Sequence, residues 1–356
     1  MTPMARALPH AIGFVLPAIV LVSARLGGAW TFFPVAVLYV IIPAIDALVG
    51  LNKSNPGAPE ETPLSENPAF RAITWLWVPV QIALIGWGVE RVANGALTPV
   101  EAVGTTLSIG LTAGAIGMTF AHELIHRPSR LERLLGDVLL VSVTYPHFAI
   151  EHVHGHHRHV GTPRDPATAR YGESLYAFLP RTVIGGVRSA CRIEARRLGK
   201  HGKPALGPAN RMLRYAGVVC VLYAIVGLRY GWSGIVFFAA QSVVAFGLIE
   251  TINYIEHYGL VRQEVVPGQY ERVMPWHSWD STHRVSNWIL INLARHADHH
   301  LAASKRYQIL HALEGAPQLP AGYGAMFVLA LAPPLWRRVM DPRVATARAG
   351  SRRARG

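Results

Sequence analysis

Histidines gather in four clusters of the sequence, and a neutral imidazole is the commonest protein ligand for transition metals. The densest cluster is 151–159, where five of nine residues are histidine. In the first cluster His122 and His126 lie four positions apart, so a helix places both rings on one face. The other two clusters are His257 and the run 296–300. These spacings indicate a metal site assembled from distant parts of the chain.

Nine histidines have the strongest spacing, and their number bears on the metal. These candidate ligands are His122, His126, His152, His156, His157, His257, His296, His299 and His300. One zinc ion uses about four ligands, and a catalytic zinc uses about three and keeps a position open. Nine ligands are therefore too many for one metal. Two metals of octahedral preference, with open positions for dioxygen, would use them all, and imidazole suits iron.

The order of residues within the clusters predicts which rings face the same way. His152 and His156 share a helix face, whereas His157 lies about 140° round from His152 on an ideal helix. Its participation needs a second metal or a local bend, for which Gly155 is well suited. The run 296–300 offers histidines at i, i+3 and i+4, which a helix presents as one three-pronged face.

The remaining histidines are interpreted as residues outside the metal site. Four of them stand alone and are read as ordinary surface or core residues: His10, His201, His277 and His311. Four others lie close to a cluster but outside its strongest spacing: His147, His154, His159 and His283. A lone histidine is more often a satisfied surface or core residue than a ligand, so neither set is counted among the ligands.

Carboxylates stand near the clusters, and six of them are expected to support the metals: Glu123, Glu151, Glu256, Asp298, Asp165 and Asp46. Several metal charges in a poorly hydrated place are costly unless acids lie near them. We expect these acids to accept hydrogen bonds from the distal ring nitrogens and to balance charge. The alternative is a set of ordinary surface acids, and for Asp46 an interfacial charge at a helix end.

The composition is that of a membrane protein. Hydrophobic residues make up 51% of the chain, charged residues only 15%, and the mean hydropathy is positive at +0.26. The formal charge of +13 therefore indicates basic loops beside anionic lipid and not nucleic-acid binding. Cys191 and Cys220 form no C-x-x-C pair, which excludes an iron–sulfur or rubredoxin centre in this chain.

Six apolar runs of roughly 20 residues are long enough to span a bilayer. They cover 8–27, 29–50, 70–92, 98–121, 211–229 and 232–254. The first run is read as a span and not as a cleaved signal peptide, because the second follows almost at once, as in a helical hairpin. Gly110, Gly114 and Gly117 in the fourth run predict a helix-packing surface in preference to a tunnel wall.

The histidine clusters lie at the ends of spans and in the basic segments 127–209 and 258–320. Within the first segment, the arginine-bearing stretch 186–198 predicts a helix on the membrane surface, and the basic tail 341–356 is expected to be disordered. The positive-inside bias places the basic segments in the cytoplasm. The sequence thus predicts an all-α integral membrane protein with six transmembrane helices. It has one domain, 1–340, with a histidine-rich di-iron cap and both termini on the cytoplasmic side of a bacterial-type inner membrane.

Four motifs together resemble those of one enzyme family. They are His122-Glu-Leu-Ile-His-Arg127, Glu151-His-Val-His-Gly-His-His157, Asn253-Tyr-Ile-Glu-His-Tyr-Gly-Leu260 and Leu293-Ala-Arg-His-Ala-Asp-His-His300. They are similar to the three histidine boxes and the H-Y-G motif of the membrane-bound alkane 1-monooxygenases, which belong with the integral-membrane desaturases and hydroxylases. The resemblance extends from about residue 43 to residue 336.

This resemblance implies a cytoplasm-facing site with two non-haem iron ions. It implies dioxygen-dependent hydroxylation of medium-chain n-alkanes to 1-alkanols. Electrons would pass from NAD(P)H through a flavin reductase and a rubredoxin to the irons. Because this chain has no C-x-x-C pair, the rubredoxin must be a separate protein, and an acidic rubredoxin would be attracted by a basic surface.

Three other functions compete with this hypothesis. A fatty-acid or xylene-type hydroxylase or desaturase on the same scaffold would use the same ligands with a different tunnel. An intramembrane zinc protease would use the H-E-x-x-H pattern of 122–126, but it leaves seven of the nine histidines unexplained. A histidine-rich metal transporter is disfavoured because the clusters lie beyond the ends of the spans and not within them.

Overall fold

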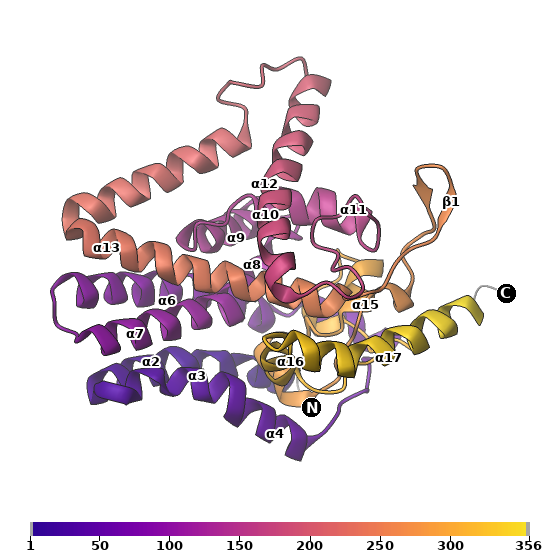
Figure 1. Cartoon of the computed structure of the whole chain (residues 1–356), viewed down its shortest axis with the longest axis horizontal. Coiled ribbons are helices and arrows are strands. Elements are labelled where there is room, and N and C mark those ends of the chain that lie inside the picture. The colour runs from indigo at the N-terminus through magenta and orange to yellow at the C-terminus, as the bar shows by residue number, and fades with distance from the viewer. Residues whose placement is uncertain (1–2, 354–356) are drawn as a thin grey trace.

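The computed structural model describes residues 3–353, and helices dominate this part of the chain (Figure 1). Five helical segments are long and apolar enough to cross a membrane: Met4–Leu26, Gly28–Val49, Pro68–Ala93, Pro99–Ile125 and Arg211–His257. The protein is therefore a multi-pass membrane protein with a bundle of apolar helices, and a cap of shorter elements closes one end of it (Figure 1).

The fifth segment, α13 (Arg211–His257), consists of two helices that meet at Gly231. Its 47 residues would extend about 70 Å as one straight helix, more than twice the hydrocarbon thickness of a bilayer. Gly231 has φ 66° and ψ −161°, a conformation that favours glycine, and the chain turns back there (Figure 1). We call residues 211–230 the first limb and residues 232–257 the second limb. The count of six transmembrane crossings stays a prediction.

The first two spans form a hairpin of irregular helices. The first span contains α1 (Pro3–Ala7), η1 (Leu8–Phe14) and α2 (Val15–Leu26). The second contains η2 (Gly28–Phe32), α3 (Phe33–Ala36), η3 (Val37–Ile41) and α4 (Ile42–Val49). Gly27, with φ 71°, allows the sharp reversal between them. This reversal lies where the sequence predicted a helical hairpin.

In the next two spans, side chains cap the first helical turns. A short helix, α5 (Ala58–Glu66), leads into α6 (Pro68–Ala93), where the Asn67 side chain accepts a hydrogen bond from the Ala69 amide. Thr98 and Glu101 form a capping box at the start of α7 (Pro99–Thr112). The helix continues through a π-helical stretch, η4 (Ala113–Met118), into α8 (Thr119–Ile125).

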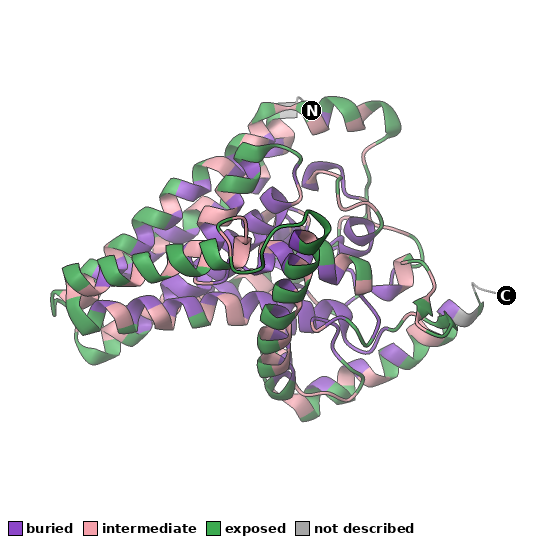
Figure 2. Cartoon of the chain, turned by 90° about the horizontal axis from the view of Figure 1, so that it is seen from above, coloured by how far each residue is buried: buried purple, intermediate pink, exposed green. Residues whose placement is uncertain are grey.

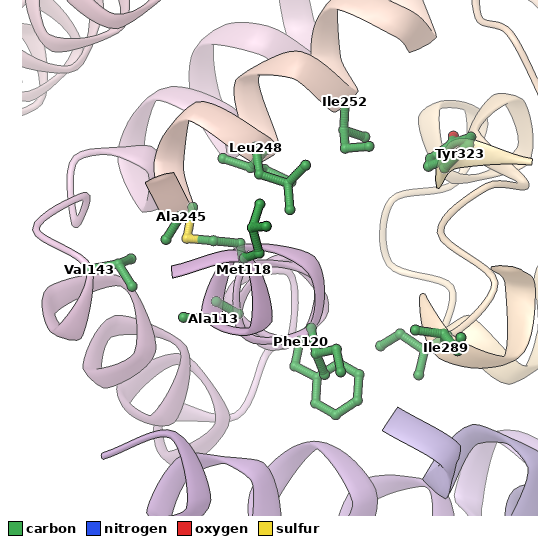
Figure 3. Close-up of a cluster of buried hydrophobic side chains, with 14 of the residues drawn as sticks. Ala113, Met118, Phe120, Val143, Ala245, Leu248, Ile252, Ile289 and Tyr323 are labelled. Carbon is green, nitrogen blue, oxygen red and sulfur yellow. The ribbon is translucent and has the colours of Figure 1, made fainter. Parts of the chain in front are cut away.

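Glycines of the fourth span let the second limb of α13 pack closely against it. A Cβ atom on Gly110 would lie 2.8 Å from the Gln241 carbonyl oxygen, and one on Gly114 would lie 2.8 Å from the Ala245 carbonyl oxygen. Gly110 and Gly114 therefore lie on a helix-packing surface, as predicted, and Gly114 also lines the apolar cavity described below. Figure 3 shows the buried apolar cluster at this contact, in which Met118 lies beside Ala245.

The cap is built from two stretches of chain that flank α13. Before it come α9 (Arg130–Ser142), α10 (Phe148–Glu151), η5 (His152–His156), α11 (His157–His159) and α12 (Leu175–Lys200). After it come β1 (Glu264–Val266), β2 (Gln269–Tyr270), η6 (Pro275–His277), α14 (Arg284–Ile289), α15 (His296–Leu301), η7 (Tyr307–Ile309), α16 (Tyr323–Ala330) and α17 (Pro333–Arg353). The antiparallel β1–β2 hairpin, with Glu264 opposite Tyr270, is a small exception to the all-α prediction.

Helix α12 runs across the direction of the bundle helices, which suits the surface helix predicted over 186–198 (Figure 1). Its far end is tied to the start of α13 by Glu194, whose carboxylate is fully buried and lies 2.6 Å from a nitrogen of Arg197 and 2.9 Å from Nε of Arg211. Figure 2 shows that buried residues concentrate inside the bundle and where it meets the cap, whereas much of α12 is exposed.

The prediction of a disordered tail over 341–356 was wrong for 341–353, which are helical, and 354–356 lie outside the described residues. Helix α17 is held by an apolar stripe at four-residue spacing, Trp336, Met340 and Val344, each fully buried. Arg348 also donates a hydrogen bond to the Gly259 carbonyl oxygen. The high arginine content of this tail predicted disorder, but the tail continues a helix whose apolar face packs against the cap.

Candidate metal centre

All nine candidate histidines come together in two adjoining groups. The first, the five-histidine group, contains His122, His126, His152, His157 and His299. The second, the four-histidine group, contains His156, His257, His296 and His300. Within each group the ligand atoms all lie within 4.8 Å of one another. Four segments far apart in the sequence therefore converge, as the spacing predicted.

The nitrogen–nitrogen distances suit a metal with right-angled ligand positions. In the five-histidine group, Nε2 of His157 lies 3.0 Å from Nε2 of both His152 and His299. In the four-histidine group, Nε2 of His296 lies 3.1 Å from that of His257 and 2.9 Å from that of His300. Two nitrogens about 2.1 Å from one metal are about 3.0 Å apart at a right angle and about 3.4 Å apart at a tetrahedral angle. These closest pairs thus have the spacing of neighbouring ligands at a right angle on one metal ion.

The second cluster divides between the two groups because its helix is locally widened. Residues His152–His156 form the π-helix η5, in which hydrogen bonds span five residues. His157 therefore faces the same way as His152, while His156 joins the other group. A Cβ on Gly155 would lie 2.5 Å from Oε1 of Glu151, so glycine is needed where the helix packs against that carboxyl group. A π-helical widening takes the place of the bend expected near Gly155, and it separates two rings that were predicted to share a face.

The run 296–300 divides in the same way. His296 and His300 face His257 in the four-histidine group, whereas His299 faces the five-histidine group. The predicted single three-pronged face is therefore shared by two sites. Helix α15 lies between the groups and contributes to both.

Arg127 fixes the first cluster against the loop after α15. Its side chain is buried and donates hydrogen bonds to the carbonyl oxygens of Ser304, at 2.8 Å, and Lys305, at 2.9 Å. Its Nε donates to the Glu123 carbonyl oxygen at 3.0 Å. One buried guanidinium thus sets the position of the α8 ligands relative to those of α15.

Burial keeps most of these imidazoles neutral, which is the form that binds metal. It lowers the pKa of His152 and His157 well below the usual value, and neighbouring histidines lower it further. His122, His126 and His156 have Nε2 atoms that are buried and have no hydrogen-bond partner among the described residues. Unpaired buried polar atoms are costly, and a bound metal ion would satisfy them.

Asp165 makes the contact expected of a supporting acid. Its Oδ2 lies 2.9 Å from Nδ1 of His156 and accepts a hydrogen bond from the Thr168 hydroxyl at 2.6 Å. Burial alone would lower the pKa of His156, but the Asp165 carboxylate outweighs it and raises this pKa. Asp165 thus holds the proton on Nδ1 and leaves Nε2 free for a metal.

Glu256 lies on the metal-facing side of the ring and not behind it. Its Oε2 is 3.2 Å from Nε2 of His296, the atom that converges with the other ligands. Its Oε1 accepts a hydrogen bond from the Tyr323 hydroxyl at 2.6 Å. The expected contact with a distal ring nitrogen is therefore replaced by a carboxylate that Tyr323 aims into the four-histidine group.

Three of the proposed supporting acids make other contacts and, within residues 3–353, no hydrogen bond to a candidate ligand ring. The carboxylate of Glu123 faces the Arg127 guanidinium at 3.5 Å. The Asp298 carboxylate accepts a hydrogen bond from the Lys305 ammonium group at 2.9 Å. The Asp46 carboxylate accepts a hydrogen bond from the Val285 amide at 2.7 Å and caps the start of α14. For these acids the observed contacts are with a cation or a helix terminus, and their role in balancing the charge of the site stays a prediction.

Glu151 lies beside the π-helix and close to two other buried carboxyl groups, those of Asp165 and Glu250. Burial, and then the charge of Asp165, raises the pKa of Glu151 to about 8. Its neighbour Glu250 is also buried and accepts hydrogen bonds from the hydroxyls of Tyr145, at 2.9 Å, and Thr182, at 2.7 Å. Sequence reasoning missed Glu250, although it stands seven residues before His257, two turns back on the same helix face.

Asp280 is a second residue that the sequence did not reveal. It is fully buried, and its carboxylate accepts a hydrogen bond from the Ala297 amide at 2.7 Å, which anchors the start of α15. Burial raises the pKa of Asp280 to about 8. It lies in an irregular loop far from any cluster in sequence, so only the fold brings it near.

The other histidines lie outside both groups, as predicted. Nδ1 of the buried His10 lies 3.2 Å from the Trp288 carbonyl oxygen, and His283 pairs with the Ser281 hydroxyl at 2.9 Å. The remainder are likewise absent from the two groups: His147, His154, His159, His201, His277 and His311.

A narrow apolar cavity of about 50 Å³ lies between the bundle helices and the cap. Thr119, one turn before His122, and Ile252, one turn before Glu256, line it together with Tyr323. Figure 3 shows Leu248, Ile252, Ile289 and Tyr323, which all border this space. The cavity therefore borders helices that carry site residues one turn further along.

A basic groove of about 720 Å³ lies on the outer side of the second cluster. Its floor includes His154 and Gly155, so the histidines of η5 lie directly beneath it. The positively charged side chains that line it are Arg158, Arg164, Arg192, Arg196, Arg197, Lys200 and Arg211. The two faces of the metal centre thus differ: one meets an apolar cavity and the other a cationic groove.

Comparison with known proteins identifies the family. A fatty acid desaturase family model matches residues 98–330, which include all nine candidate ligands. The chain is 43% identical over 324 residues to alkane 1-monooxygenase 2 of Pseudomonas aeruginosa, covering 90% of this chain and 86% of that protein. It is 42% identical to alkane 1-monooxygenase 2 of Alcanivorax borkumensis, covering 88% of this chain and 83% of that protein. The chain belongs to the alkane 1-monooxygenase family.

A more distant relative has a different named substrate. The chain is 30% identical over 274 residues to the hydroxylase component of a xylene/toluene monooxygenase from Pseudomonas putida, covering 76% of this chain and 73% of that protein. Family membership makes the chain a membrane monooxygenase of the histidine-box superfamily, and thus an oxidoreductase.

Proposed function

We propose that this protein hydroxylates the terminal carbon of medium-chain n-alkanes with dioxygen, at a centre of two non-haem iron ions. The observation that carries the proposal is the convergence of nine imidazoles in two adjoining groups, with an apolar cavity lined by residues one helical turn from two of the site residues. The names of the alkane 1-monooxygenase relatives support the substrate class.

The proposed irons would occupy the five-histidine and the four-histidine groups. When bound, they supply the activation of dioxygen that an unreactive C–H bond requires. The chain's own residues prepare the site. Asp165 holds the proton of His156 on Nδ1, and Tyr323 orients Glu256 toward the four-histidine group. The other four acids contribute negative charge or fold stability.

Regioselectivity would come from shape, because an alkane has no polar group to bind. The cavity of about 50 Å³ is small beside the roughly 300–1,000 Å³ of a typical ligand pocket. It therefore admits a chain end, and a longer alkane must displace wall residues. Tyr39 and Phe327, stacked with ring centroids 4.5 Å apart, form part of the cavity wall that a longer alkane would have to displace.

Electrons would come from a separate rubredoxin, reduced by an NAD(P)H-dependent flavin reductase. The basic groove supports this assignment, because an acidic protein docked there would lie directly above His154 and the η5 histidines. Electrostatic steering of this kind speeds encounter and weakens with added salt. The groove's charge also supports the proposed orientation, with the cap and both termini on the cytoplasmic side of the inner membrane.

The test is product analysis with purified protein, a rubredoxin and its reductase. Octane, p-xylene and a fatty acid are supplied separately under air, and the products are identified by gas chromatography and mass spectrometry. The proposal predicts 1-octanol as the main product and its loss when His152 or His257 is changed to alanine, with His201→Ala as the matched control. Preferred oxidation of p-xylene would favour the second candidate, to which the xylene/toluene monooxygenase relative points.

A further inference from the structure

A second hollow lies on the outside of the bundle, between the first limb of α13 and helices α6 and α9. It encloses about 610 Å³ and is separate from the apolar cavity beside the histidines. Three helices contribute its aliphatic walls, which include Ile82, Val138, Val141, Val218, Val221 and Ile225. We call this hollow the outer groove.

The apolar wall of the outer groove is incompletely covered by the protein itself. Val218, Val221 and Ile225 on the first limb are 52%, 58% and 57% exposed. Alternating exposed and buried positions are ordinary on a lipid-facing helix, but here three helices surround the same space. Such a concave site holds a hydrocarbon chain in more contacts than the flat outer surface of a bundle can.

One end of the outer groove is polar. Arg211, Arg214, Tyr215 and Asp137 line it there, all within the first turns of α13 or on the facing helix α9. The Tyr215 hydroxyl donates a hydrogen bond to Asp137 at 2.9 Å, and Arg211 is paired with Glu194. Among the residues that the structure describes, no carboxylate forms an ion pair with the exposed Arg214. This end therefore presents a free guanidinium beside hydrogen-bonding groups.

The length of the outer groove matches one leaflet of a bilayer. Its wall runs along α13 from Tyr215 to Ile225, ten residues, which is about 15 Å at about 1.5 Å per residue. Half of the hydrocarbon thickness of a typical bilayer is also about 15 Å. The polar end is thus placed at headgroup level and the aliphatic walls at acyl-chain level.

The geometry points to one anionic phospholipid held in the outer groove, with its phosphate at Arg214 and Arg211 and an acyl chain along Val218, Val221 and Ile225. This binding site is independent of the proposed catalytic function. The basic groove shares Arg211 with the outer groove, so the surrounding potential is strongly positive. That potential favours an anionic headgroup over a zwitterionic one. It also disfavours a second copy of this +13 chain as the occupant.

The experiment uses the full chain in detergent, equilibrated with equal amounts of phosphatidylglycerol and phosphatidylcholine and examined by native mass spectrometry. The wild-type protein should retain one phosphatidylglycerol in preference to phosphatidylcholine. Arg214→Gln should reduce that preference about fivefold, as expected for one basic side chain near a lipid phosphate. The matched control is Arg229→Gln, on the same helix at the far end of the first limb, and it should leave the preference unchanged.

A second pair of variants tests the acyl-chain part of the site. Val221→Trp places a large ring on the wall of the outer groove, across the proposed path of the acyl chain, and should abolish retention of the lipid. Leu228→Trp places the same side chain on the same limb at a position that is 91% exposed and outside the groove, and it should retain the lipid. Thermal unfolding of each variant verifies that it is folded. Three results would each overturn the proposal. The first is equal retention of the two lipids by the wild type, and the second is an equal effect of Arg214→Gln and Arg229→Gln on the lipid preference. The third is a lipid-free dimer that is cross-linked through position 221.

Discussion

Replacing Asp165 by asparagine should weaken iron binding without unfolding the protein. The carboxylate accepts the proton of His156 Nδ1, the Thr168 hydroxyl and the Ala167 amide, at 2.9, 2.6 and 3.0 Å. Asparagine has the same shape but only one acceptor oxygen. If its amide group faces His156, the imidazole proton moves to Nε2, where it blocks the metal. If the amide is flipped, the Ala167 amide loses its acceptor.

The expected size follows from the loss of this one oriented, charged contact. Changing such a partner of a ligating histidine typically costs about 10–100-fold in metal affinity, or about 1.4–2.7 kcal/mol. The assay is anaerobic titration of the iron-free protein with ferrous iron, together with the melting temperature. Asp137→Asn is the matched control, because that acid also accepts a hydroxyl hydrogen bond but belongs to neither histidine group. Wild-type iron affinity in Asp165→Asn would refute the reasoning.

Three further predictions concern the backbone and a buried ion pair. Gly155→Ala should lower iron content, because its Cβ would meet the Glu151 carboxyl group at 2.5 Å and distort η5; unchanged iron content, measured by mass spectrometry, would contradict this. Gly114→Leu should destabilise the bundle by about 1–3 kcal/mol, since the Cβ position is 2.8 Å from the Ala245 carbonyl oxygen; a wild-type unfolding free energy would show that the contact is not tight. Burial opposes ionisation of Glu194, but hydrogen bonds from its two arginine partners lower its pKa to about 2. Because a depressed carboxyl pKa stabilises the fold above the unfolded-state pKa, that stabilisation should fade as pH falls from about 4.5 toward 2. Glu194→Gln should therefore flatten the stability profile in that range, and an identical profile would exclude the role.

The sequence predicted which histidines converge because their signal is local. Pairs such as His122 and His126 lie one helical turn apart, and a helix brings them together whatever the rest of the fold does. The assignment of ligands to groups was not predictable in the same way. The π-helix η5 turns His157 rather than His156 toward His152, and an ideal-helix projection does not contain that widening.

The supporting polar residues were harder to predict because their partners come from other elements. Asp165 was identified by its nearness to the second cluster, but Glu250, Asp280 and Tyr323 reach the site only through packing of α13, α15 and α16. The reverse error occurred at Asp46, which looked like a membrane-depth acid and instead caps α14. The position of an acid in the sequence does not show whether its carboxylate already interacts with a cation or a helix terminus.

The tail shows how composition can hide a pattern. Counting arginines over 341–356 predicts disorder, whereas the four-residue spacing of Trp336, Met340 and Val344 predicts a helix with one apolar face. The structure follows the spacing. Both signals are present in the sequence, and the error came from reading the tail separately from the residues just before it.

Iron content per chain tests the central claim most directly, since the two histidine groups should hold one iron each. Protein purified without oxygen should contain about two iron ions per chain, and His257→Ala, which removes a ligand from the four-histidine group only, should contain about one. His201→Ala should still contain about two. One zinc ion and no iron in the wild type, or an unchanged iron content in His257→Ala, would contradict the account.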